Sequence, residues 1–355
     1  MLAVVASLFL SFPSYDYLNS ASADESWEPV LRQFSDPSTN MTDYYGSESH
    51  ASKKTFRLTV PILAHLLGFK TIGAVCLQGL AGVLLLFFAV SLFFRITRDR
   101  PSAFFLTLAI SFSYPGTASF VELRGIFDGV ALCAMLGSMW ARHPVGIAGA
   151  VFFASWTDER GLIASSLVWI YHALRRTGAQ SRSQFSIDLW EQRAVAVVIA
   201  WILYFISRIG MVSIYELETA TGGIGLGVFF DQINQIPMGL WTGLEGGWLV
   251  VLLAGSVLWA TCSWRALACL AAATVVIAGV ALSVVDITRS MAYLLPAVFI
   301  GTRVLAEVDS GPTLRSYSVL ACAISLFWAA YYAGGVSTIW WNYPLPIQAL
   351  RWLVT

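Results

Sequence analysis

Charged residues are scarce in this chain of 355 residues. Asp, Glu, Lys and Arg make up only 12% of it and hydrophobic residues make up 57%, whereas an ordinary soluble domain has roughly 25% charged residues. This deficit excludes an ordinary soluble domain and predicts a polytopic membrane protein. The formal net charge is zero, so nothing in the composition indicates nucleic acid as a partner.

Histidine and cysteine are few as well. The five cysteines lie in or beside apolar runs, without the spacing that metal ligands require, and the four histidines are scattered. We therefore expect the cysteines to be small core residues, and neither a disulfide framework nor a zinc site is indicated. No metal is expected at the functional site.

The start of the chain, MLAVVASLFLSF, lacks the basic n-region of a signal peptide. Its run of about 11 apolar residues is too short for a bilayer, which needs roughly 20. Either this segment is a short or tilted first helix, or the true start lies upstream. The chain has no internal repeat and no soluble domain boundary, which favours a single membrane domain over residues 1–355.

Long apolar runs are present through the rest of the chain. Each is predicted to be a helix, because an unclosed segment can satisfy its backbone in lipid only as a helix. With the first apolar segment, these runs predict an all-α bundle of about eleven crossings. Several are shorter than roughly 20 residues, which is typical of broken helices that line a cavity. The predicted spans are 71–94, 102–114, 126–140, 145–156, 161–174, 194–209, 240–260, 266–285, 291–304 and 319–335.

Arginines in the connections predict the orientation of the bundle, because they concentrate on the cytoplasmic side. The opposite, extracytoplasmic face then receives the polar first loop, 14–70, with an interfacial helix. It also receives the loop 210–239, which separates the spans of 71–209 from those of 240–355. The arginines on the predicted cytoplasmic side are Arg95, Arg98, Arg100, Arg142, Arg175, Arg176, Arg182, Arg265 and Arg315.

Acids stand beside arginines in the extracytoplasmic connections. Arginine suits a phosphate group because its planar fork makes bidentate, charge-assisted bonds. Carboxylates and several arginines on one face are the inventory needed to move a group from a phosphorylated lipid. The residues concerned are Glu122, Arg124, Asp158, Glu159, Arg160, Asp286 and Arg289.

Two aspartates are notable for their positions. Asp128 enters a predicted span, where ionisable residues are costly and indicate function. The alternative is a structural ion pair with Arg124, four residues earlier on the same helix face. Asp16 lies just outside the first apolar segment, where lipid-borne and water-borne reactants meet. Its neighbours Tyr15 and Tyr17 suit either an interfacial belt or a wall for stacking a sugar.

Four motifs follow one another along the chain. SYDY at 14–17 opens the first loop, RLTVPILAHLLG at 57–68 closes it, FDGVALCAMLGSMW at 127–140 begins a span, and TDERGLIAS at 157–165 follows a short hairpin. This order resembles the GT-C superfamily of integral-membrane glycosyltransferases, especially bacterial members that use polyprenyl-phosphate sugars. Their first loop opens with Asp in a YD context and ends in an R-L-x-x-P-x-L-A-x-L-L segment. The resemblance covers the first half of the chain, and in the second half it rests on DITRS and general topology.

The resemblance implies inverting transfer of a sugar from a polyprenyl-phosphate donor to an acceptor. The transfer would take place on the extracytoplasmic face of the bacterial inner membrane, without a cofactor beyond the donor. Asp16 would be the base that deprotonates the acceptor hydroxyl. Arg57, Arg160 and Arg289 would hold the donor phosphate.

The carboxylates Asp158 and Glu159 would orient hydroxyl groups of the acceptor or donor. The expected partners are the lipid-linked donor, membrane lipid and other proteins of a membrane complex. The full set of expected substrate-binding residues is Arg57, Arg124, Asp128, Asp158, Glu159, Arg160, Asp286 and Arg289.

Two alternatives stay open. Many GT-C relatives carry a pair of acids in the first loop, whereas Asp16 has no acidic neighbour. The second hypothesis is therefore a GT-C-like structural or accessory subunit of a membrane complex, without catalysis. A transporter is the third, although the ionisable residues gather at one membrane face and not at the midplane, where carriers bind coupling ions.

Overall fold

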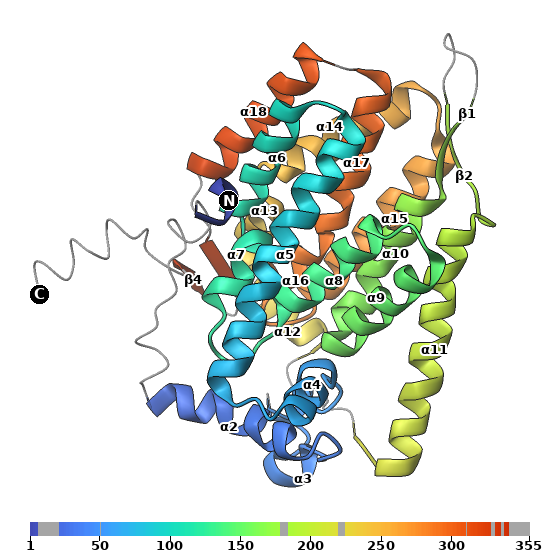
Figure 1. Cartoon of the computed structure of the whole chain (residues 1–355). Helices are drawn as coiled ribbons and strands as arrows, with labels where there is room; N and C mark the ends of the chain where they lie inside the picture. The colour runs from blue at the N-terminus through green and yellow to red at the C-terminus, as the bar shows by residue number, and fades with distance from the viewer. Residues whose placement is uncertain are drawn as a thin grey trace, which may run out of the picture.

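The computed structural model describes residues 1–5, 21–49, 51–177, 184–218, 224–309, 311–327, 331–334 and 337–340. This part of the chain is mostly helical, as the apolar runs predict, with two short β-hairpins. Figure 1 shows the longer helices standing side by side, with α2, α3 and α4 at one end and the strands β1 and β2 at the other. We call these the α4 end and the β1 end of the bundle.

The predicted first loop is largely helical where it is described. Its helix α2 docks on the bundle through Trp27, whose indole Nε1 donates to the Leu123 carbonyl oxygen at 2.7 Å. The Gln33 amide of α2 donates to the Lys54 carbonyl at 2.9 Å. These bonds hold the segment that precedes α4 beneath the bundle. The elements are α2 (Ala21–Ser35), α3 (Thr42–Tyr45), the 3-10 helix η2 (Ser52–Lys54) and α4 (Thr59–Leu67).

The bundle itself starts at α5 and ends at α18. Its helices are α5 (Thr71–Thr97), α6 (Arg100–Phe112), α7 (Tyr114–Val121), α8 (Asp128–Trp140), α9 (Pro144–Thr157), α10 (Glu159–Ala173), α11 (Gln192–Tyr215), α12 (Leu226–Asp231), η3 (Ile233–Gln235), α13 (Ile236–Leu244), α14 (Gly247–Ala260), α15 (Trp264–Leu282), α16 (Ile287–Met291), η4 (Ala292–Leu294), α17 (Leu295–Val308) and α18 (Pro312–Phe327). The antiparallel hairpins are β1 (Leu174–Thr177) with β2 (Gln184–Ile187), and β3 (Tyr331–Gly334) with β4 (Ser337–Trp340).

Within the described ranges, four helical segments are long and apolar enough to cross a membrane. Two further pairs pass the same test together but are bent, α6–α7 by 52° and Ile233–Thr242 against α14 by 84°. Counting each bent pair as one span gives six candidate spans among the described residues, by length and composition, which supports the predicted membrane character. The four straight segments are Thr71–Thr97, Gln192–Tyr215, Trp264–Leu282 and Ile287–Val308.

Burial separates the outer from the central helices. In the most apolar window of α11 only 22% of the residues are buried, against 78% in Ile287–Val308. An apolar helix that leaves its side chains uncovered has found no protein to pack on, which is typical of a surface facing lipid. The buried segment packs on α5 through α17, where the ring of Phe299 stacks on that of Phe93 with centroids 4.3 Å apart.

One predicted boundary is wrong. The expected span 319–335 ends as a helix at Phe327, and residues 331–334 form β3. A Gly-Gly pair at 334–335 disfavours a helix and suits a hairpin turn. Over the expected extracytoplasmic loop 210–239, α11 continues to Tyr215, the short helix α12 covers Leu226–Asp231, and α13 begins at Ile236.

Candidate active site

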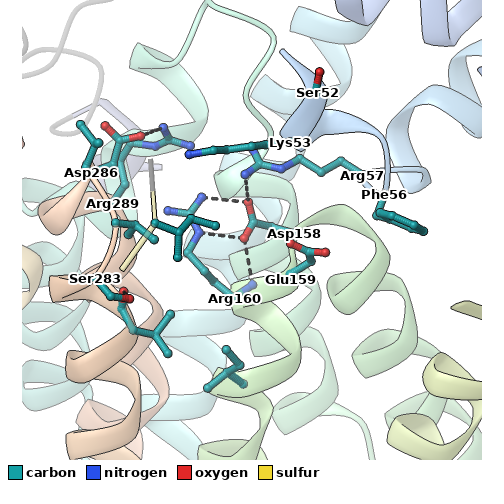
Figure 2. A pocket seen from close by; sticks show the side chains of 15 residues that line it. Ser52, Lys53, Phe56, Arg57, Asp158, Glu159, Arg160, Ser283, Asp286 and Arg289 are labelled. Atoms are coloured by element: carbon teal, nitrogen blue, oxygen red, sulfur yellow. Dashed lines mark hydrogen bonds and ion pairs between the residues drawn. The ribbon is translucent and has the colours of Figure 1, made fainter. Parts of the chain in front are cut away.

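A cavity of about 310 Å³ lies at the α4 end of the bundle. Its charged wall residues come from three places: η2 with the segment after it, the start of α10, and the connection from α15 into α16. Figure 2 shows charged side chains from all three reaching toward one another. Apolar side chains, among them Ile163, Val280 and Val284, line the rest of the wall. The cavity therefore has arginine and lysine side chains on one wall and apolar side chains on another.

Asp158 is placed by the junction of two helices. It ends α9 and caps α10, since its carboxylate accepts from the Arg160 backbone N–H at 2.9 Å. The Arg160 guanidinium also reaches this carboxylate, with Nε and Nη2 each 2.8 Å from an oxygen. On the cavity side, Arg57 Nη2 lies 3.2 Å from Asp158. Burial disfavours the charged form, but Arg160 and Arg57 outweigh it and hold the pKa of Asp158 well below its ordinary value.

Asp128 lies one layer behind the cavity and is fully buried at the first residue of α8. Arg160 Nη2 donates to one carboxylate oxygen at 2.8 Å, and Arg289 Nε donates to the other at 2.7 Å. The Tyr293 hydroxyl adds a bond of 3.3 Å. Asp128 thus joins α8, α10 and α16 through a carboxylate that is saturated with donors.

Glu122 continues this network at the end of α7. The Tyr114 hydroxyl donates to it at 2.8 Å, while Arg289 and Arg124 lie 3.8 and 3.6 Å from its oxygens. Its side chain is fully buried, and burial raises the pKa of Glu122, offset in part by the two arginines. The local pair that we considered for Asp128 and Arg124 is therefore wrong, because Arg124 lies beside Glu122.

Two further ion pairs involve residues that line the cavity. Arg289 pairs with Asp286 three residues earlier, and both side chains line the wall. Glu159 pairs with Arg208 of α11 at 2.6 Å, and that guanidinium lies 3.8 Å from the centre of the Phe56 ring. Cation–π contact and ion pairing together fix the position of Arg208 against the first-loop segment.

Arg57 retains unused hydrogen-bonding capacity. Its Nε atom is buried and has no hydrogen-bond partner among the described residues. An unsatisfied buried donor is costly, so a site with one is poised for an acceptor from outside. Arg57 lines the cavity, and among the described residues its ion pair is with Asp158, which Nη2 makes.

The structure brings together the expected site residues that it describes. Those that line the cavity are Arg57, Asp158, Glu159, Arg160, Asp286 and Arg289, whereas Asp128 and Arg124 lie behind it. Asp16, the expected base, lies outside the described residues.

Sequence reasoning missed several members of the cluster. Tyr114 and Tyr293 gave no signal, because a buried tyrosine in an apolar run looks like any core aromatic. Ser290, which accepts from Arg160 at 3.0 Å, sits beside Arg289 in the DITRS segment and could have been noticed there. Arg208 follows an apolar run without an acid nearby in the sequence, so only the fold pairs it with Glu159.

Metal ligation has no support among the described residues, where no group of three or more His, Cys, Asp or Glu side chains is arranged to hold an ion. The charged groups that line the cavity are carboxylates, guanidinium groups and the ammonium group of Lys53. Comparisons with protein-family models, with curated proteins and with solved structures found no match for this chain.

Proposed function

We propose that this chain is a membrane glycosyltransferase that moves a sugar from a polyprenyl-phosphate donor to an acceptor. The observation that carries the proposal is the cavity at the α4 end, where arginines distant in sequence meet beside an apolar wall. A phosphorylated polyprenol has the matching chemistry, with an anionic head next to a hydrocarbon chain. Arg57, whose buried Nε lacks a partner, is proposed to bind the phosphate.

In the proposed reaction the bond between the anomeric carbon and the phosphate oxygen breaks. A bond from the acceptor oxygen to the anomeric carbon forms on the opposite face, and the acceptor proton passes to a carboxylate. The polyprenyl phosphate leaves as an anion, and cationic groups around it lower the barrier by stabilising that developing charge. The carboxylate proposed as base is Asp16.

The proposal includes a finer topology. In it the chain crosses the bacterial inner membrane about eleven times in a GT-C-like arrangement, with shorter helices such as α8 and α9 as crossings. The α4 end faces the periplasm or exterior and the β1 end faces the cytoplasm. Supporting this orientation, the β1 end carries many exposed arginines, of which several, such as Arg142 and Arg265, have no acid partner among the described residues.

Binding of undecaprenyl phosphate to the purified full chain tests the lipid part of the proposal. Arg57→Ala is expected to weaken binding by roughly tenfold or more, the loss of one charge-assisted contact. Arg265→Ala is the matched control, because Arg265 is exposed at the start of α15, at the β1 end. Native mass spectrometry of the lipid complexes gives the readout. Equal binding by the Arg57→Ala protein and the wild type would remove Arg57 from the site.

Transfer is tested separately in membranes from cells that express the chain, supplied with undecaprenyl-phosphate-linked hexoses carrying a label in the sugar. Movement of the label to an acceptor is expected for the wild type and not for Asp16→Asn. Transfer at the wild-type rate by that variant would exclude Asp16 as the base.

The second candidate function is a GT-C-like accessory subunit without catalysis. It is favoured by the saturation of Asp128 and Asp158, whose oxygens already accept from arginines and leave little room for substrate. Undecaprenyl phosphate binding without transfer from any labelled donor would support this alternative over the enzyme.

A further inference from the structure

A second cavity lies at the β1 end of the bundle, and the proposed transferase chemistry makes no use of it. Its volume is also about 310 Å³, and it is bounded by the ends of α5, α8, α10 and α17 and the start of α11. The 13 residues of α8 separate it from Asp128, a distance of about 20 Å along a helix. Figure 1 shows these helices running from the α4 end toward β1.

This second cavity is strongly cationic. Counting arginines and glutamates only, five positive and two negative side chains line it, a net charge of +3. The glutamates are Glu191 and Glu307, and the arginines are Arg95, Arg142, Arg175, Arg193 and Arg303.

Some of these arginines serve the fold. Arg95 donates to the carbonyl oxygens of Met139 and Trp140, at 2.8 and 2.9 Å, at the end of α8. Arg303 donates to the Tyr171 carbonyl of α10 at 2.6 Å. Helix C-termini leave carbonyls unsatisfied, so these two contacts have a structural reason. They also anchor two guanidinium groups in fixed positions at the cavity wall.

The positive charge of the other arginines is not explained by contacts with helix ends. Glu191 forms an ion pair with Arg175. Glu307 forms one with Arg176, which does not line the cavity. Arg142 and Arg193 are exposed and make no ion pair or hydrogen bond with any described residue. Both arginines line the same concave site, Arg142 between α8 and α9 and Arg193 near the start of α11, so their like charges repel each other there. An anion between them would reverse that repulsion.

We infer that this second cavity binds an anionic phosphate group, supplied by the headgroup of a membrane phospholipid. Guanidinium forks match phosphate oxygens in geometry and charge. Basic pockets between membrane helices are typical sites for anionic headgroups. The neighbouring faces of α5 and α11 expose apolar side chains, including Phe94 and Ile199, along which acyl chains can pack.

The test uses the purified full chain in detergent, with the thermal midpoint followed by tryptophan fluorescence. It is titrated in separate arms with dihexanoyl phosphatidylglycerol, dihexanoyl phosphatidylcholine and inorganic phosphate. The double variant Arg142→Gln, Arg193→Gln is compared with the wild type, and Arg265→Gln is the control. Both substituted arginines are exposed and have no ion pair among the described residues, so the midpoint without lipid is expected to stay the same or to rise slightly as their repulsion is removed.

Phosphatidylglycerol is expected to raise the wild-type midpoint and phosphatidylcholine to leave it nearly unchanged. The double variant is expected to need roughly tenfold or more phosphatidylglycerol for half of the shift, and the Arg265→Gln protein is expected to behave like the wild type. If inorganic phosphate alone produces the same variant-sensitive shift, the phosphate site stands and its ligand is soluble. An equal phosphatidylglycerol response in double variant and wild type would overturn the inference.

Discussion

Asp128 shows at the residue scale how a membrane protein keeps a charge away from water. Its oxygens accept from Arg160 at 2.8 Å and from Arg289 at 2.7 Å, and the carboxylate is fully buried. Ionisable groups buried inside a protein are tolerated when they are paired, but removing one partner leaves uncompensated charge. The three residues therefore act as one unit.

Asp128→Asn is expected to destabilise the protein by about 3–5 kcal/mol, because it leaves two buried guanidinium groups without their shared carboxylate. Thermal unfolding in detergent measures the loss. Asp231→Asn is the matched control, since Asp231 is exposed at the end of α12. Equal midpoints for the two variants would mean that the pairs contribute nothing to stability.

Lys54 gives a second prediction at this scale. Burial first, and then the charges of Arg57, Arg289 and Arg124, lower the pKa of Lys54 from 10.5 to about 7. Between those values the unfolded chain binds this proton and the folded chain does not, so stability rises with pH across the window.

Replacing Lys54 by Met removes the loss of stability that burial of this ionisable lysine causes below pH 10.5. The Lys54→Met variant is expected to be more stable than the wild type near pH 7, and the difference should shrink as pH approaches 10.5. Thermal midpoints from pH 7 to 10 measure the difference. Lys70→Met serves as the control, because Lys70 is exposed. A difference that is constant with pH would contradict the lowered pKa.

At the element scale, α7 and α8 approach closely beside the buried charges. A Cβ added at Gly129 would lie 2.8 Å from the Ser119 Cα atom, a backbone atom that cannot move aside alone. The same helix carries Gly137, where the nearest atom to an added Cβ is a Phe88 ring carbon at 3.4 Å. One glycine is required by packing and the other is not.

The two glycines should respond in opposite directions to alanine. Gly129→Ala is expected to destabilise by about 1–3 kcal/mol through overpacking. Gly137→Ala is expected to be neutral or to stabilise by up to about 1 kcal/mol, because alanine favours a helix. Thermal unfolding of both proteins provides the comparison. A stable Gly129→Ala protein would show that α7 can shift away from α8.

Much of this element scale could be predicted from the sequence. The hydrophobic run of α5 and the proline starts of α6 and α9 are local signals, so the predicted spans overlap the observed helices. The bend after Phe112 and the break at Glu245 were not predicted. Glu245 adopts φ +48°, a backbone conformation that a composition window cannot detect.

At the scale of the whole molecule, two charged cavities lie at opposite ends of one apolar bundle. In the cavity at the α4 end, most arginines are paired with acids. The cavity at the β1 end has a net positive charge. Arginines in short connections concentrate on the cytoplasmic side of membrane proteins, so the proposed orientation places the β1 end there. It leads to a prediction about sidedness that does not depend on catalysis.

Cysteines placed at the two ends should be labelled from opposite sides. Glu48→Cys near α3 is expected to react with an impermeant maleimide in intact cells, and Leu189→Cys after β2 only after permeabilisation. Both positions are exposed, and the background carries serine at the exposed Cys76 and Cys262. Labelling of Leu189→Cys in intact cells, without labelling of Glu48→Cys, would reverse the orientation.

The sequence by itself determined that this chain is a membrane-type helical protein and which of its residues are costly to bury. Composition and apolar runs suffice for this, because the cost of exposing backbone or charge to lipid depends only on local residue types. It also singled out Arg57, Asp158 and Arg160 as residues of interest at one end.

Only the tertiary structure decided which acidic side chain pairs with which basic side chain. Asp128 pairs with Arg289, 161 positions away, and not with its helical neighbour Arg124. Such pairing depends on how helices dock, and small contacts such as Gly129 on Ser119 set that docking. The two cavities likewise arise where helix ends fail to fill space, a property of the packed bundle that no single segment carries.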